Sequence, residues 1–215
     1  MADEVIALFD LSNGRVAEAK ERFEKLAAFD VDLETSIASA TVLSILCDAS
    51  GETSAAQLYR QRARELAAGL PTRTWLIVET LDRFKRPDEA TQMAVRLIES
   101  QLHDSKERVR PQEAALALRL LIRADRIEEA SALGESLAAR GLASPGLLAN
   151  RGVAYARLGA FDKAIAMFRT VLAAESDNAE VHANLAMGRT TTPPTKRPSP
   201  RRLTGGSLAK ERSPQ

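Results

Sequence analysis

Similar segments recur along this chain at a spacing close to 34 residues, and that spacing limits the possible fold more than any other feature. Each segment opens with a proline and an apolar helical pattern, followed by a short polar break, an acidic residue or pair, and an alanine. Matching landmarks are 34 residues apart at Pro111–Pro145 and Ala130–Ala164. They are 40 residues apart at Pro71–Pro111 and Ala90–Ala130, so we place six extra residues in the charged stretch 99–110. A fixed period of this length is typical of a protein built from stacked supersecondary units.

Each segment carries the signals of two amphipathic helices joined by a tight turn. A proline is tolerated at the first helical position, where its missing N–H would have no partner in any case. Acidic pairs such as Glu128 and Glu129 begin the second helix and complement its dipole. Asp125 and Glu128 have the spacing of a capping box, and Gly159 permits the left-handed residue that ends a helix. Neither helix can bury its apolar stripe alone, so the hairpins must stack.

The last complete segment, residues 145–178, resembles a tetratricopeptide repeat (TPR). The resemblance rests on the small residues, aromatic residues and turn glycine of the repeat: Gly152, Tyr155, Gly159, Ala164 and Phe168. The segment departs from the family pattern at three positions: Leu148, Arg151 and Ser176. The segment at 111–144 matches through its apolar positions and lacks the aromatic residues. The resemblance implies an all-α protein, a right-handed α-solenoid of stacked helix-turn-helix repeats.

We divide the chain into a TPR-like repeat domain, residues 1–188, and a tail, residues 189–215. The hairpins are expected at 1–34, 35–70, 71–110, 111–144 and 145–178, with a partial repeat at 179–188. The first two hairpins are assigned from a glycine turn followed by small and aromatic residues, with Phe23 and Tyr59 as the aromatics. Upstream of residue 71 the match to the family weakens, which leaves the number of N-terminal repeats open.

The tail is basic and rich in Pro, Ser and Thr. It holds seven Lys or Arg against one acid and five of the nine prolines. Such a segment cannot bury enough apolar surface to offset the entropy of ordering it, so we predict disorder. The basic stretch 196–202 could bind an acidic surface. The abrupt change in composition would also fit a frame-shifted or truncated end.

Composition and motifs exclude several classes of site. A formal net charge of +1 gives no basis for predicting nucleic acid binding. A single cysteine, Cys47, and two histidines, His103 and His182, cannot supply a disulfide framework, a cysteine-based zinc site or a histidine-rich metal site. No phosphate-binding loop, dinucleotide motif or nucleophile elbow occurs. We therefore predict no enzyme activity, no metal and no cofactor.

No membrane partner and no export are predicted either. No apolar stretch approaches the length of a membrane span, and the opening Met-Ala-Asp-Glu lacks the basic residues of an export signal. We expect a cytoplasmic protein, whose oligomeric state the sequence leaves open.

In the family, the first helices of the repeats line a concave groove that binds extended peptides or partner helices. The resemblance implies that the following residues face or border this groove: Trp75, Arg83, Arg119, Arg123, Asn150, Arg157 and Asn184. The arginines could form a basic stripe suited to carboxylates, or they could be a solvated face. Trp75 could anchor an apolar side chain of the partner, or it could pack between helices.

These inferences favour a non-enzymatic scaffold for protein–protein interaction. Its partner would be a protein or peptide with acidic groups for the basic stripe. Two alternatives stay open: the repeat portion of a larger bacterial enzyme such as a transferase, and an accessory chaperone of secretion or pilus assembly. Resumption of repeats or a catalytic domain in the downstream DNA would favour the first alternative, and co-purifying export substrates would favour the second.

Overall fold

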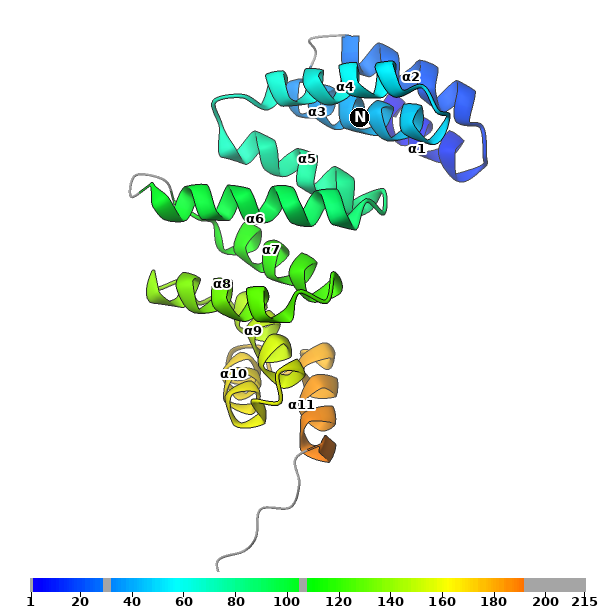
Figure 1. Cartoon of the computed structure of the whole chain (residues 1–215). Helices are drawn as coiled ribbons and strands as arrows, with labels where there is room; N and C mark the ends of the chain where they lie inside the picture. Colours follow the sequence, from blue (N-terminus) through cyan, green and yellow to red (C-terminus); the bar gives the residue numbers. More distant parts are fainter. Residues whose placement is uncertain (1, 29–31, 105–107, 192–215) are drawn as a thin grey trace, which may run out of the picture.

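The computed structural model of the chain describes residues 2–28, 32–104 and 108–191 (Figure 1). These residues form eleven α-helices and no strand. The helices are α1 (Ala2–Ser12), α2 (Val16–Ala28), α3 (Leu33–Ala49), α4 (Thr53–Ala67), α5 (Pro71–Arg83), α6 (Pro87–His103), α7 (Pro111–Arg123), α8 (Ile127–Ala139), α9 (Pro145–Arg157), α10 (Phe161–Ala174) and α11 (Ala179–Thr191). The predicted all-α helical repeat solenoid is confirmed.

Consecutive helices pair into hairpins, and the hairpins stack along one direction with α1 and α11 at opposite ends (Figure 1). The second helix of a hairpin packs on the first helix of the next, as α6 does on α7 and α8 does on α9. First helices also meet across hairpins, α3 with α5 and α7 with α9. Helix α5 makes little direct contact with α7.

The recurring alanine that begins the second helix of each hairpin is buried in every case. These alanines are Ala19, Ala56, Ala90, Ala130 and Ala164, all at most 1% exposed. Because each has only a methyl side chain, the two helices of a hairpin can approach closely at this point. The core between them is filled by large apolar residues such as Phe23, Ile98 and Phe168. The period seen in the sequence is therefore a period of helix–helix packing.

The turn inside each hairpin uses one residue with a positive φ, two positions after the first helix ends. Glycine supplies it at Gly14, Gly51 and Gly159, where φ is 75–79°. Lys85 and Asp125 adopt the same conformation with φ of 57°. The predicted capping box is therefore wrong, because Asp125 lies in the turn and Arg126 is the residue that precedes α8.

The six extra residues of the third segment lengthen α6 and its connection to α7. Helix α6 has 17 residues, whereas α5, α7 and α8 have 13 each. Arg110, at the end of the connection, pairs with the buried Glu113 in the first turn of α7, with 2.8 Å between Nε and Oε1. The insertion thus lies between the third and fourth hairpins, which still pack on each other through α6 and α7.

Helix α11 runs to Thr191, three residues past the predicted end of the repeats at 188. The predicted disordered tail lies outside the described residues from 192 onward. No helix in the described ranges combines the length and the apolar character needed to cross a membrane.

Asp32 caps α3, the first helix of the second hairpin, and the contribution of its charge can be tested. Its carboxylate accepts hydrogen bonds from the Thr35 hydroxyl at 2.6 Å and from the backbone N–H groups of Glu34 at 3.2 Å and Thr35 at 3.3 Å. These bonds, the hydroxyl first, hold the pKa of Asp32 below its ordinary value of 3.8. Since the folded state has the lower pKa, the stabilisation is complete above the ordinary value and is lost as pH falls through the lowered one.

We expect Asp32→Asn to be less stable than the wild type at neutral pH, with the difference shrinking in acid. Asparagine also caps helices, so the comparison isolates the charge of the carboxylate. Urea unfolding at about pH 7 and about pH 3 measures both values. A difference that stays constant with pH would contradict this account.

Candidate functional site

Two first helices, α5 and α7, are joined on their exposed side by one carboxylate and two arginines. Asp82 of α5 lies 2.6 Å from Nη1 of Arg123 and 3.3 Å from Nη2 of Arg119, one oxygen to each. The carboxylate is mostly buried, whereas the arginine side chains are 54% and 50% exposed. Each guanidinium has five N–H donors, so most donors of this pair still face solvent.

A third arginine repeats the arrangement one hairpin further along. Nη1 of Arg157 on α9 donates to the carbonyl oxygen of Ile122 at 3.3 Å and to Oδ1 of Asp125 at 3.2 Å. The side chain of Arg157 is half exposed and that of Asp125 is almost fully exposed. We call Arg119, Arg123 and Arg157 the arginine row. Each arginine of the row contacts a neighbouring hairpin and is about half exposed to solvent.

The electrostatics of the row suit a carboxylate ligand. The Arg157–Asp125 pair is exposed on both sides and contributes at most about 1 kcal/mol, because water and salt screen it. A ligand carboxylate can therefore share these guanidinium groups, or displace Asp125, at small cost. Charge-assisted hydrogen bonds between a guanidinium group and a carboxylate are also stronger than hydrogen bonds between neutral groups.

Trp75 is not at the surface, which corrects the expectation that it anchors a partner in the groove. Its side chain is 1% exposed and belongs to the main apolar core. The indole Nε1 has no hydrogen-bond partner in the described part of the chain. Helix α5 is packed by α3, α4 and α6, and Trp75 fills the space between them, the alternative that the sequence left open.

The remaining predicted residues divide between the surface and hairpin contacts. Arg83 is exposed and has no hydrogen bond or ion pair to any residue that the structure describes. Asn150 on α9 donates from Nδ2 to the carbonyl oxygen of Ala115 on α7 at 2.9 Å, so it joins two hairpins. Asn184 is half buried on α11.

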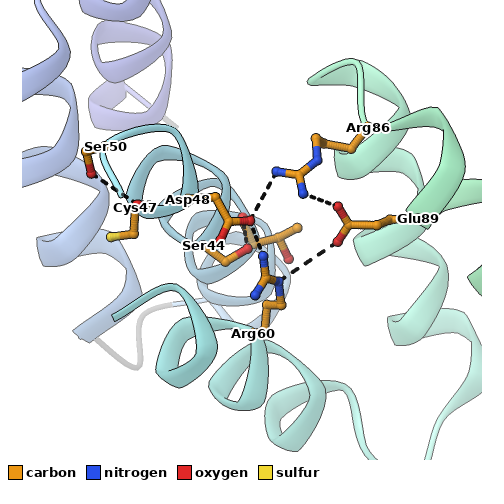
Figure 2. A network of polar contacts seen from close by, with 8 residues as sticks. Ser44, Cys47, Asp48, Ser50, Arg60, Arg86 and Glu89 are labelled. Atoms are coloured by element: carbon orange, nitrogen blue, oxygen red, sulfur yellow. Dashed lines mark hydrogen bonds and ion pairs between the residues drawn. The ribbon is translucent and has the colours of Figure 1, made fainter. Parts of the chain in front are cut away.

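A polar network that the sequence did not reveal ties the second hairpin to the third. Figure 2 shows Asp48 of α3 between Arg60 of α4 and Arg86, with Glu89 of α6 facing both arginines. Oδ2 of Asp48 is 3.2 Å from Nη1 of Arg86, and Oε2 of Glu89 is 3.9 Å from Nε of Arg60. All four side chains are only partly exposed, so the network serves to hold hairpins together.

A signal for part of this network was present in the sequence. Arg86 precedes Glu89 by three residues, and Arg126 precedes Glu129 by three residues in the next hairpin. The second acid of each pair is thus an ion-pair partner of the recurring arginine. Interpreting the acidic pairs through the helix dipole alone missed this role.

The cysteine and the two histidines lie on three different helices, α3, α6 and α11. Cys47 is buried, and desolvation raises the pKa of its thiol, which keeps the sulfur protonated and unreactive. His103 and His182 each meet a backbone carbonyl, that of Glu99 at 2.7 Å and that of Ser176 at 2.8 Å. Within the described ranges, no group of three or more His, Cys, Asp or Glu is arranged to hold a metal ion.

A cleft of about 620 Å³ lies between two second helices, α6 and α8. Its wall and floor include Val95, Leu102, Leu121 and Leu133, with Glu99 and Arg140 at the edge. A second hollow lies next to it, since Val95, Glu99 and Glu129 line both. The arginine row thus lies on first helices, whereas these two hollows are lined mainly by second helices.

Comparisons with known proteins identify the fold. The sequence matches no protein-family model, and none of the curated proteins matches it. Among solved structures, a tetratricopeptide repeat protein from Parabacteroides merdae is similar with a TM-score of 0.53, 11% identity, and coverage of 88% of this chain and 72% of the other. The ArsTM double mutant of MamA RS-1 gives a TM-score of 0.52 at 13% identity, covering 72% of this chain and 84% of the other.

A third solved structure, YrrB, is described as a TPR protein with an unusual peptide-binding site. It gives a TM-score of 0.50 at 15% identity, covering 84% of this chain and 89% of that one. The fold is that of helical repeat solenoids. More specifically, the chain is a TPR-like helical repeat protein, as the sequence predicted.

Proposed function

We propose that this chain is a non-enzymatic scaffold that binds an acidic peptide or an acidic partner helix along its first helices, α5, α7 and α9. The observation that carries the proposal is the arginine row. Two half-exposed guanidinium groups lie on α7 and a third lies on the next first helix, α9. The two on α7 are fixed by a carboxylate that is itself mostly buried. Arg83 adds a fourth exposed guanidinium on α5.

The fixed geometry of the row favours recognition over a plain solvated face. An arginine held by an ion pair loses less side-chain freedom when a ligand binds, so less of the binding free energy is spent on ordering it. The peptide-binding site in the description of YrrB, a protein of similar fold, is consistent with a peptide ligand here. The remaining donors of Arg119 and Arg123 would then bind carboxylates of the partner.

The proposal is tested by reversing the charge of the row. We expect Arg119→Glu with Arg123→Glu to weaken partner binding by about 1 to 3 kcal/mol, because charge-assisted hydrogen bonds are lost. Affinity capture from the native host followed by mass spectrometry compares this double variant with the wild type. Far-UV circular dichroism should show unchanged helix content, since both arginines are half exposed.

The chain offers a control with the same change of charge at another surface. Arg62 on α4 and Arg96 on α6 are exposed and form no ion pair with any residue that the structure describes, so Arg62→Glu with Arg96→Glu leaves the arginine row intact. A partner that the wild type and this control retain, and that the row variant loses, supports the proposal. A partner lost only by the control binds the second helices, and a partner that both variants retain does not use arginine recognition.

A further inference from the structure

The outer face of α1 is apolar and exposed. Val5, Ile6 and Phe9 are 66%, 40% and 59% exposed, and they lie within little more than one helical turn. The opposite face of the helix carries Ala7 and Asp10, which are buried against α2. The packing inside the first hairpin therefore does not account for the three exposed apolar side chains.

Comparison with an interior first helix shows that the outer face of α1 lacks a packing partner in the described ranges. Helix α3 is packed by α2 on one side and by α4 and α5 on the other, and most of its central residues are buried. Helix α1 has the packing partner α2, and no hairpin covers its outer side among the residues described. An outer face that the stacked hairpins leave uncovered is normally polar. Apolar side chains gathered at such a position mark an interaction surface.

We propose that this face is the interface with a second copy of the chain, with the two α1 helices packed antiparallel about a two-fold axis. The face is self-complementary in this arrangement. A two-fold axis on the outer face, level with the midpoint between Val5 and Phe9, sets Val5 of one copy opposite Phe9 of the other, and the same contact is repeated by symmetry. An isologous interface requires this kind of pairing, in which one patch meets itself.

The charges at the two ends of α1 fit the same arrangement. Asp3, in the first turn, is exposed and has no ion-pair partner among the described residues. Arg15, just beyond the other end, places its guanidinium 5.6 Å from the centroid of the Phe9 ring and 2.6 Å from Asp10. Its side chain is still about half exposed, so donors remain for a second carboxylate. Antiparallel packing brings the acidic end of each helix to the basic end of the other.

Sedimentation equilibrium of the full chain tests the proposal. We expect a concentration-dependent dimer whose dissociation constant rises at least about 30-fold in Phe9→Glu, since a central interface aromatic is replaced by a charge in both copies. The matched control is Leu58→Glu on α4, where a leucine that is 68% exposed lies away from α1. This control should leave the dissociation constant unchanged, and circular dichroism should show the same helix content for all three proteins.

Cysteine pairing tests the antiparallel arrangement. We expect a mixture of Val5→Cys and Phe9→Cys chains to form a disulfide between unlike copies under mild oxidation, while either variant alone forms little. Cys47 does not interfere, because it is buried. A wild type that stays monomeric at every concentration, a dimer that Phe9→Glu leaves intact, or cross-links mainly between like copies would each overturn the proposal. A monomer that captures a different protein through this face would also overturn it.

Discussion

Replacing Trp75 by alanine should lower the free energy of unfolding by about 3 to 5 kcal/mol, the cost of truncating a large buried aromatic residue. The side chain is 1% exposed and lies in the main apolar core. Its Nε1 has no hydrogen-bond partner, so the loss is one of packing and apolar burial with no hydrogen bond included. Urea unfolding followed by far-UV circular dichroism measures the difference in stability.

Trp75→Phe is the matched control. It keeps an aromatic ring in the same space and removes an N–H group that has no partner, so it should cost clearly less than the alanine variant. Binding of a partner along the arginine row should be nearly unchanged in Trp75→Phe. A Trp75→Ala protein of wild-type stability that no longer binds its partner would instead place the ring at the interaction surface.

The case of Trp75 shows what repeat periodicity can and cannot predict. The period predicts the hairpins, because apolar stripes and small residues recur wherever helices pack. It does not predict how far α5 tilts against α3, α4 and α6, and that tilt decides whether a bulky residue faces solvent or the core.

The arginine row shows a second limit. The sequence predicted four arginines on first helices, and the structure places all four there, Arg83 exposed and the three of the arginine row about half exposed. The sequence did not predict the carboxylate partners of the row, Asp82 and Asp125. Ion pairs between hairpins depend on the rotation of one hairpin against the next. Asp125 was predicted to cap a helix. It adopts a left-handed backbone conformation in the turn instead, and its carboxylate accepts a hydrogen bond from Arg157.

Gly152→Val should be the most disruptive single substitution in the last complete hairpin. A Cβ atom at Gly152 would lie 2.5 Å from Cε1 of Phe168 and 2.9 Å from its Cδ1, far inside van der Waals contact. The Phe168 ring is buried on α10 and cannot swing into solvent. We therefore expect a loss of about 3 kcal/mol or more, because overpacking forces the helices apart. Urea unfolding gives the total loss of stability.

Hydrogen exchange should locate that loss. In a solenoid each hairpin is stabilised mainly by its nearest neighbours, so faster exchange should be confined largely to α9, α10 and α11. Gly146→Ala on α9 is the control, because its new methyl would lie 3.7 Å from Cβ of Ala115, an ordinary contact. Alanine is the better helix former, so this variant should be as stable as the wild type or up to about 1 kcal/mol more stable.

A double variant identifies the contact that makes glycine necessary at position 152. If the clash with the Phe168 ring is the cause, Phe168→Leu should cost less stability on a Gly152→Ala background than on the wild type, since the smaller side chain makes room for the new methyl. The coupling free energy between the two sites should then be favourable by about 0.5 to 3 kcal/mol, the range for residues in contact. Strictly additive effects would mean that the backbone of α9, and not the ring of Phe168, requires glycine. The small residue in the sequence pattern of the repeat would then reflect helix geometry rather than the fit of one ring against one backbone.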